Sequence, residues 1–297
     1  MQNINGILLL DKPSGITSNK ALQRVRSLIK AKKGGHTGSL DPFATGMLPL
    51  CFGEATKISH YLLNKEKTYS VEVKLGVSTS TGDLDGEITG SSKIKEYSED
   101  QWKKFLNEFK GESEQIPPMY SALRYKGKRL YEFARKGEIV DRAARKIQIF
   151  SIKLIDLSKD TINFEVTCSK GTYIRVLAED IAKKLGMLGH VSQLRRKSVG
   201  NFLESKMVNL SILEDLAQNN NLAISDCFIT IDEALTEFSV VSLNDLQSSK
   251  FRNGQQLEFD GHFDDNVKVY DHNNNLVGIA YKKNQNTLAP KRIFHLS

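Results

Sequence analysis

The first 30 residues pass from an apolar run to an amphipathic stretch. Four consecutive aliphatic residues at positions 7–10 predict a buried strand that ends in the Pro/Gly turn of LDKPSG. Ser18 stands where a helix N-cap is expected, and the apolar positions after it recur at helical spacing. These positions are Leu22, Val25, Leu28 and Ile29. The pattern therefore predicts a strand, a tight turn and an amphipathic helix.

Alternation of apolar and polar positions then marks the strands of a main domain. TYSVEVKLG alternates strictly and predicts a half-buried strand with Tyr69, Val71, Val73 and Leu75 on its apolar face. Further strands are expected at about 146–157 and 161–168, and amphipathic helices in SEDQWKKFLNEF and GTYIRVLAEDIAKKLG. Because short turns join these strands and no regular βαβ repeat is evident, we predict antiparallel pairing and an α+β fold.

The pattern changes near Phe238. From there onward, short strand-like runs (NVKVYD, LVGIAY and KRIF) are separated by turns rich in Asn and Asp. We therefore predict a main α+β domain over residues 1–237 and a small β-rich domain over residues 238–297.

Net charge adds a class of partner to this picture. The 297 residues carry a net charge of +7, and residues 241–297 contribute only 7 Lys and Arg against 6 Asp and Glu, so the basic excess belongs to the main domain. Clusters near residues 24–33, 124–129 and 195–197 suit a polyanion through phosphate contacts and counterion release. The alternative is that they are ordinary solvated surfaces.

Cysteine content and the N-terminal run limit the compartment. Cys51, Cys168 and Cys227 are far apart and odd in number, which argues against a disulfide framework and favours a reducing cytoplasm. The apolar run at residues 7–10 is too short for a signal sequence or a membrane span. A soluble cytoplasmic protein with no membrane partner is expected.

The loop GGHTGSLDPFATG, residues 34–46, holds one aspartate, Asp41, in a backbone stiffened by glycines and Pro42. It lacks the Lys-Ser/Thr of a phosphate-binding loop and the GxGxxG of a dinucleotide loop, and His36 and Asp41 have no partners at metal-ligand spacing. Glycoside hydrolysis usually enlists two carboxylates. A single fixed carboxylate instead suits a reaction at an anomeric carbon whose leaving group stays bound. The structural alternative is that Asp41 caps a turn or a helix that begins at Pro42.

This loop, extended to GHTGSLDPFATGMLPLCFGEATK, resembles the catalytic-loop signature of the bacterial TruB family, the tRNA pseudouridine-55 synthases. Ser39 and Phe43 stand where Ala and Leu are commoner in that family. Further segments agree in the same order: LLLDKPSGITSN, KTYSVEVKLGVSTSTGDLDGE, QIPPMYSALRYKGKRLYEFARKG, CSKGTYIRVLAEDIAKKLG and SQLRRKSVG. Together they span nearly all of residues 5–200. The tail, with NGQQL and KRIF, resembles more weakly the small PUA-like domain of the family.

The resemblance implies a pseudouridine-synthase fold, with a central mixed, mainly antiparallel sheet flanked by helices. It also implies that a T-loop uridine of tRNA is detached at its nitrogen, rotated and rejoined to the same ribose through carbon, with no cofactor or metal. By analogy Asp41 is the essential acid. Whether it attacks the sugar or the base, or removes a sugar proton, stays open at the level of sequence.

Other site residues follow from the same resemblance. Arg175, in GTYIR, is the cation expected to keep Asp41 ionised against desolvation, and Asp83 would share it. From the residues alone, Arg175 could equally pair with Glu179 one helical turn later, and Asp83 could be a turn residue. Tyr173, in the same GTYIR segment, is taken as a substrate-binding residue.

The target base would lie between an aromatic ring and an aliphatic side chain. The resemblance places Tyr69 over the base, where it could stack and assist proton transfer at carbon 5, and Leu194 on the apolar side of the pocket. Both could equally be ordinary core residues. Lys12, in LDKPSG, would support the site from a neighbouring turn.

RNA recognition would require flipping the base out of the T-loop, at a cost of about a few kcal/mol. His36 resembles the family residue that contacts the loop and occupies the vacated space. The basic clusters would follow the phosphates, and the aromatic and cationic segment at residues 120–135 would clasp the RNA.

Three functional readings remain from sequence: a stand-alone tRNA pseudouridine synthase, an RNA-folding protein in which isomerisation is secondary, and a guide-RNA-dependent relative that modifies ribosomal RNA. The guide-dependent reading would call for long basic extensions, which this chain lacks. The stand-alone enzyme is favoured, as a monomer that binds the T-loop and stem of tRNA, since the sequence carries no heptad signature of an interface.

Overall fold

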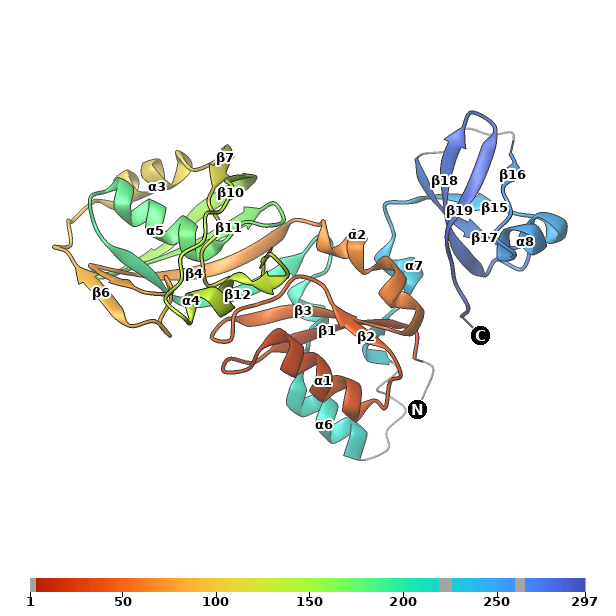
Figure 1. The fold of residues 1–297 in the computed structure, drawn as a ribbon, viewed down its shortest axis with the longest axis horizontal. Coiled ribbons are helices and arrows are strands. Elements are labelled where there is room, and N and C mark those ends of the chain that lie inside the picture. The colour runs from red at the N-terminus through yellow and green to blue at the C-terminus, as the bar shows by residue number, and fades with distance from the viewer. Residues whose placement is uncertain (1–3, 219–225, 260–264, 297) are drawn as a thin grey trace.

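The computed structural model describes residues 4–218, 226–259 and 265–296. Its largest element is a ten-stranded sheet with β13-β1-β3-β12-β4-β11-β10-β7 in spatial order, to which β2 and β14 add at β3 and β1 (Figure 1). Within this sheet, among the described residues, only the β1–β13 and β3–β12 strand pairs are parallel. The predicted α+β fold with a mixed, mainly antiparallel sheet is therefore confirmed.

The elements up to residue 134 are β1 (Gly6–Lys12), α1 (Ser18–Leu28), β2 (Gly34–His36), β3 (Thr45–Phe52), η1 (Gly53–Ile58), α2 (Ser59–Leu63), β4 (Lys67–Leu75), β5 (Val77–Thr79), β6 (Ile88–Ser91), α3 (Glu99–Asn107), β7 (Gly111–Gln115), β8 (Arg124–Tyr125), β9 (Lys128–Arg129) and α4 (Leu130–Ala134). The later ones are β10 (Arg145–Leu157), β11 (Thr161–Cys168), α5 (Ile174–Lys184), β12 (Gly189–Val199), η2 (Glu204–Lys206), β13 (Val208–Asn209), α6 (Leu210–Gln218), β14 (Phe228–Ile229), α7 (Ile231–Ala234), β15 (Ser239–Ser242), α8 (Asp245–Arg252), β16 (Leu257–Glu258), β17 (Asn266–Tyr270), β18 (Leu276–Asn284) and β19 (Thr287–Ile293).

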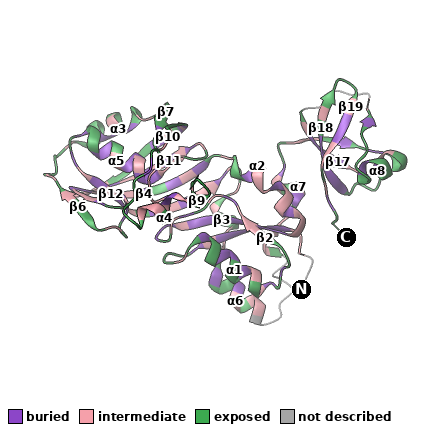
Figure 2. Cartoon of the chain, in the orientation of Figure 1, coloured by how far each residue is buried: buried purple, intermediate pink, exposed green. Residues whose placement is uncertain are grey.

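Two helix pairs cover the large sheet at its two ends. Helices α3 and α5 pack on the part formed by β4, β10, β11 and β12, and α1 and α6 lie below β1 and β3 in the view of Figure 1. The alternation in β4 puts every second residue of the strand in the core, as predicted. The strands of the sheet are largely buried, whereas the helices that cover it are exposed on their outer faces (Figure 2).

Side-chain caps mark the N-termini of helices α3 and α1. A capping box between Ser98 and Gln101 begins α3, as expected for SEDQ. At α1 the predicted cap is wrong by one residue: the side chain of Thr17 caps the helix, and Ser18 is its first residue. The Ser18 hydroxyl is buried and bonds instead to the backbone of Leu40, 22 residues away.

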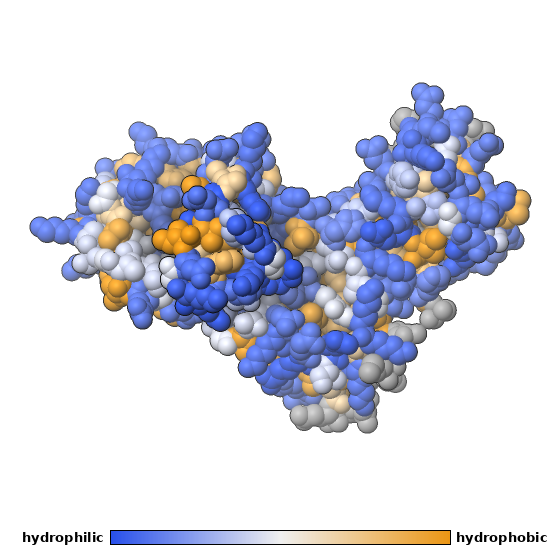
Figure 3. Space-filling view, in the orientation of Figure 1, coloured by the Kyte–Doolittle hydropathy of each residue, from blue (hydrophilic) through white to orange (hydrophobic). Residues whose placement is uncertain are grey.

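The small domain is a second sheet, with β15-β17-β18-β19-β16 in spatial order and α8 beside it. It has a core of its own, and it also contributes to a core shared with the main domain, where Leu276, Ile279 and Phe294 join Ile7 and Leu9 of β1. Polar contacts accompany this packing, including Lys57 Nζ to the Ile293 carbonyl at 2.7 Å and Lys268 to Asp232. The outline between the small domain and the α3/α5 end of the molecule is concave (Figure 3).

Candidate active site

The loop between β2 and β3 presents Asp41, and its neighbours on both sides are fixed to the start of the chain. Leu40 N donates to Ser18 Oγ at 2.7 Å. The carbonyl of Pro42 accepts from Gly15 N at 2.9 Å and from Lys12 Nζ at 3.2 Å. No helix begins at Pro42, so the alternative in which Asp41 caps one is wrong. The turn after β1 therefore holds the loop that carries the carboxylate.

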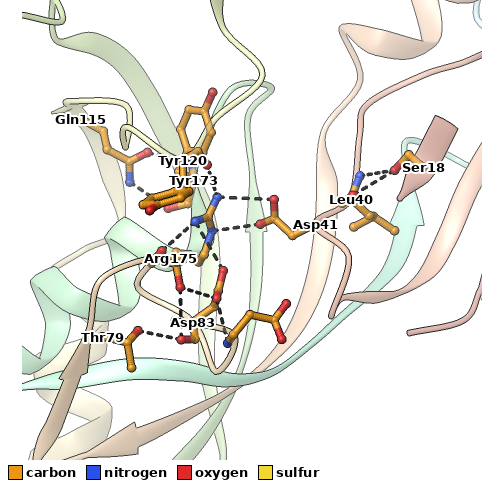
Figure 4. A network of polar contacts seen from close by, with 11 residues as sticks. Ser18, Leu40, Asp41, Thr79, Asp83, Gln115, Tyr120, Tyr173 and Arg175 are labelled. Carbon is orange, nitrogen blue, oxygen red and sulfur yellow. Dashed lines mark hydrogen bonds and ion pairs between the residues drawn. The ribbon is translucent and has the colours of Figure 1, made fainter. Parts of the chain in front are cut away.

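The carboxylate of Asp41 lies against the guanidinium of Arg175, as Figure 4 shows. Arg175 Nε is 2.9 Å from Asp41 Oδ2 and Nη2 is 3.4 Å from Oδ1, while Nη1 is 3.4 Å from Asp83 Oδ2. The carbonyls of Thr81 and Tyr120 accept from the same guanidinium, each at 2.7 Å. One arginine thus joins the two predicted acids, and the alternative pairing of Arg175 with Glu179 does not occur among the ion pairs of the described residues.

Opposing effects act on the pKa of Asp41, and their sum raises it above its ordinary value because burial has the largest effect. Burial raises the pKa of Asp41 above its ordinary value, the positive charge and hydrogen bonds of Arg175 lower it, and the Asp83 carboxylate raises it. Lys12 lowers it further, although burial brings the pKa of the lysine itself down to about 8. Arg175 is thus the main group that favours the ionised form, although burial has the larger effect on the pKa.

A cavity of about 640 Å³ opens beside this carboxylate. Three predicted residues besides Asp41 and Arg175 line it: Tyr69 from β4, Leu194 from β12 and Tyr173 at the start of α5. Tyr69 and Leu194 are 9% and 7% exposed, so an aromatic ring and an aliphatic chain form a nearly closed wall. Burial raises the pKa of the Tyr69 phenol, which keeps it protonated at neutral pH.

The remaining predicted residues lie outside the cavity lining. Lys12 is fully buried and acts as a brace on the loop, and Asp83 lies behind Arg175. His36 lies on β2, and its Nδ1 is buried without a hydrogen-bond partner among the described residues. Burial lowers the pKa of His36, so the ring is neutral at physiological pH. Tyr173, which does line the cavity, is held through its backbone. Gln115 Nε2 donates to its carbonyl at 3.1 Å, and its amide donates to Gln115 Oε1 at 2.8 Å.

The predicted basic cluster at residues 195–197 does not form one free cationic surface. Arg195 is paired with Asp11 at 3.0 Å and Glu204 at 2.8 Å, and Lys197 with Glu165 at 2.7 Å. Arg196 is only 1% exposed and points inward. Residues 195–197 are therefore engaged within the protein, because strand alternation sends the middle cation inward and acidic side chains neutralise the outer two.

The sequence analysis missed two site residues, Lys67 and Arg196, which both line the cavity. Arg196 Nε donates to the carbonyl of Met47 at 2.6 Å and Nη2 to the carbonyl of Gly38 at 2.8 Å, so it holds both ends of the Asp41 loop. A signal was present for each. Lys67 precedes Tyr69 by two positions and so lies on the apolar face of its strand, and Arg196 follows Leu194 by two positions.

Within the described residues, no cluster of three or more His, Cys, Asp or Glu side chains is placed to hold a metal ion. None of the described helices is long and apolar enough to cross a membrane.

Comparison with known proteins identifies the family. Residues 26–174 match the model of the TruB family pseudouridylate synthase N-terminal domain, residues 175–236 the tRNA pseudouridylate synthase B C-terminal domain, and residues 239–294 the pseudouridine synthase II TruB C-terminal model.

Curated relatives agree over nearly the whole chain. The tRNA pseudouridine synthase B of Nitrosococcus oceani is 49% identical over 256 residues, which are 86% of this chain and 83% of the relative. The enzyme of the same name from Hydrogenovibrio crunogenus is 42% identical over 297 residues, 100% of this chain and 96% of the relative.

Solved structures share the fold at lower identity. A chain of an H/ACA RNP bound to a substrate RNA containing 2'-deoxyuridine has a TM-score of 0.74 at 21% identity, covering 98% of this chain and 85% of that one. A chain of a Cbf5-Nop10-Gar1 complex has the same TM-score at 23% identity and the same coverage. The family models and the curated relatives together show that the chain belongs to the TruB family of pseudouridylate synthases.

Proposed function

We propose that this protein is a tRNA pseudouridine synthase that isomerises the uridine at position 55 of the T-loop. The observation that carries the proposal is Asp41, held by Arg175 at the mouth of a cavity walled by Tyr69 and Leu194, in a chain of the TruB family. A cavity of about 640 Å³ is large enough for one nucleotide and too small for a helix. The substrate base must therefore be flipped out of its stack to enter.

In the proposed reaction the bond between C1' of the ribose and N1 of uracil breaks, the uracil turns within the cavity, and C5 bonds to C1'. The C5 proton is lost to water and N1 takes up a proton from water, so the product is an isomer of the substrate. No electrons are gained or lost overall, which is why a reaction without a redox cofactor or a metal is proposed. Asp41 in its ionised form either bonds to the nucleotide or removes a sugar proton. The same carboxylate then serves both halves, because the leaving group is also the returning nucleophile.

The neighbouring residues would divide the remaining tasks. Arg175, shared with Asp83, favours ionised Asp41. Tyr69 stacks on the base and assists proton transfer at C5, and Leu194 closes the apolar wall. Tyr173 contacts the nucleotide from the cavity rim, and His36 contacts the T-loop from outside the lining. Lys12 supports the loop through Pro42.

The division of labour between domains is also part of this proposal. Residues 1–237 form the catalytic domain and residues 238–297 a PUA-like RNA-binding domain, with tRNA lying along the concave outline between them (Figure 3). The enzyme works as a monomer in the cytoplasm. The RNA-folding alternative predicts instead that Asp41→Asn keeps the biological effect.

Release of tritium from tRNA transcript labelled at C5 of uridine tests the function. The purified chain should release tritium, and Asp41→Asn should abolish release while tRNA affinity changes little, because phosphate contacts supply most of the affinity. The affinity should fall steeply with salt, with a log-log slope of about −0.7 per phosphate contact if single-stranded values apply. A folded wild-type sample that releases no tritium above background would rule the proposal out.

A further inference from the structure

Two buried cations meet at the part of the cavity wall formed by β4 and β12. Lys67 is 6% exposed and Arg196 is 1% exposed, and both line the cavity together with Tyr69. They converge beneath Gly38: the point where a Cβ of this glycine would lie is 3.3 Å from Arg196 Nη1 and 3.8 Å from Lys67 Cε. The strand register also places Arg196 directly across from Tyr69.

Neither cation has an acidic partner among the ion pairs of the described residues. Lys67 Nζ donates to the carbonyls of Leu63, at 2.8 Å, and Lys65. Arg196 donates to the carbonyls of Gly38 and Met47. These carbonyls accept some of the hydrogens of the two cations, but neither positive charge is compensated by a carboxylate. Arg175, on another wall of the same cavity, is by contrast paired with two carboxylates.

Such a pair is electrostatically unfavourable until an anion arrives. Burial lowers the pKa of Lys67 to about 8, and the charges of Arg196 and Lys170 act in the same direction. The neighbour on β11 is the Cys168 thiol, whose pKa burial raises to about 11, so it is neutral at working pH. Tyr69 on the same strand is protonated as well. The groups that face Lys67 thus supply no negative charge.

The proposed reaction supplies a negative charge near these two cations. When C1'–N1 breaks with both electrons kept by uracil, the negative charge on N1 spreads to the two ring oxygens. A flipped nucleotide also brings its phosphate oxygens to the rim of the cavity. Fixed cations in a water-poor site stabilise such developing charge without reorganising.

We propose that Lys67 and Arg196 form an anion-binding wall of the cavity that receives a negatively charged oxygen of the target nucleotide. The inference rests on the proposed function and adds two residues to it. The oxygen belongs either to the detached uracil or to the phosphate of the same nucleotide, and the two sources affect different measurements. Charge on the uracil exists only during the reaction, whereas the phosphate is charged already when the RNA binds.

The first experiment compares Lys67→Met with wild type by single-turnover tritium release at saturating enzyme and by the Kd for tRNA. If the oxygen is that of uracil, the rate falls about 100-fold and the Kd stays within twofold. If it is a phosphate oxygen, the Kd rises and the saturated rate is kept. A variant unchanged in both measurements overturns the proposal. Lys153→Met, an exposed lysine of β10, is the matched surface control and should match wild type in both.

The pH profile provides a second test that a merely structural lysine would not move. At subsaturating enzyme the wild-type rate should fall as pH rises above about 8, because Lys67 loses its charge, and Lys67→Arg should remove this fall. The pKa of Lys12 is also lowered to about 8, so Lys12→Arg serves as the control and should keep the fall. A fall that persists in Lys67→Arg contradicts the inference.

Failure of the proposed function and failure of this inference give different results. A wild-type chain without tritium release removes the function and with it the uracil source of the charge. The Kd comparison then decides on the phosphate source, and an unchanged Kd of Lys67→Met overturns the inference. An active wild type with an unchanged Lys67→Met removes only the inference. If Lys67→Met fails to fold, as judged by its melting temperature, the pH dependence of the rate of Lys67→Arg decides the test.

Discussion

The reactivity of Asp41 is set by three charged neighbours and by burial, which act in opposite directions. Arg175 and Lys12 favour the carboxylate, whereas burial and Asp83 favour the protonated acid. Arg175 makes two contacts to Asp41, and the fork shape of a guanidinium is what allows them while Asp83 is held as well. Small changes around this arginine should therefore move the pH at which Asp41 becomes active.

Two substitutions should move that pH in opposite directions. The ionised form of Asp41 is the active one in the proposed reaction, so the rate rises as pH rises through its pKa. Arg175→Lys weakens the group that lowers this pKa and should shift the acid limb of the pH profile upward. Asp83→Asn removes a nearby negative charge and should shift it downward. Single-turnover tritium release, measured between about pH 4 and pH 8, gives the position of the acid limb in both variants.

Shifts of the same sign in both variants would contradict this balance of charges. Melting temperatures and tRNA Kd values provide the control, because loss of folding would lower the rate at every pH without moving the limb.

The element that carries Asp41 depends on backbone positions as much as on side chains. Gly46 has φ of 98° at the start of β3, and a Cβ there would lie 2.3 Å from the carbonyl oxygen of Arg196. The parallel pairing of β3 with β12 thus requires glycine at this point. The motif glycine therefore has a packing role that the sequence analysis described only as a tight turn.

Gly46→Ala should destabilise the protein by at least about 2 kcal/mol, from the left-handed backbone together with the collision with β12. Gly35→Ala is the matched control on the neighbouring strand, where a Cβ meets nothing within 4 Å, and its effect should stay within about 1 kcal/mol. Urea unfolding monitored by circular dichroism measures both. Equal midpoints for the two variants would show that the close approach at Gly46 does not matter.

At the scale of the molecule, the two domains are coupled through the core that both of them build. Ile279 and Phe294 of the small domain are almost completely buried in the same cluster as Ile7 and Met47 of the large sheet. This arrangement would fix the proposed RNA-binding domain relative to the cavity, so that the distance between the two RNA contacts is set by packing.

Ile279→Ala should therefore destabilise the catalytic domain as well as its own, by about 2–5 kcal/mol. Trp102, the only tryptophan of the chain, lies in the core between α3 and the sheet and reports on the distant end of the molecule. The midpoint of its fluorescence change in urea should move to lower urea concentration. Leu246→Ala, at a side chain 67% exposed on α8, is the control and should leave the midpoint in place. An unchanged midpoint in Ile279→Ala would show that the domains unfold independently.

Sequence by itself determined the local features of this protein. Alternation fixed the faces of β4 and β11, the capping box fixed the start of α3, and the motif around Asp41 identified the loop and the family, because these properties arise between residues close in the chain. Tyr69 and Leu194 were placed at the target base only by the resemblance to the family, since their apolar positions alone are equally typical of core residues.

Only the tertiary structure decided which partners these residues have. Asp41 and Arg175 are 134 positions apart, and the choice of Arg175 between Glu179 and Asp41 depends on where α5 packs against the sheet. Arg196 reads in sequence as part of a basic surface, yet the pairing of β12 with β3 and β4 turns it into the cavity beside Lys67. Long-range strand order brings such groups together, and no pattern of neighbouring residues encodes that order directly.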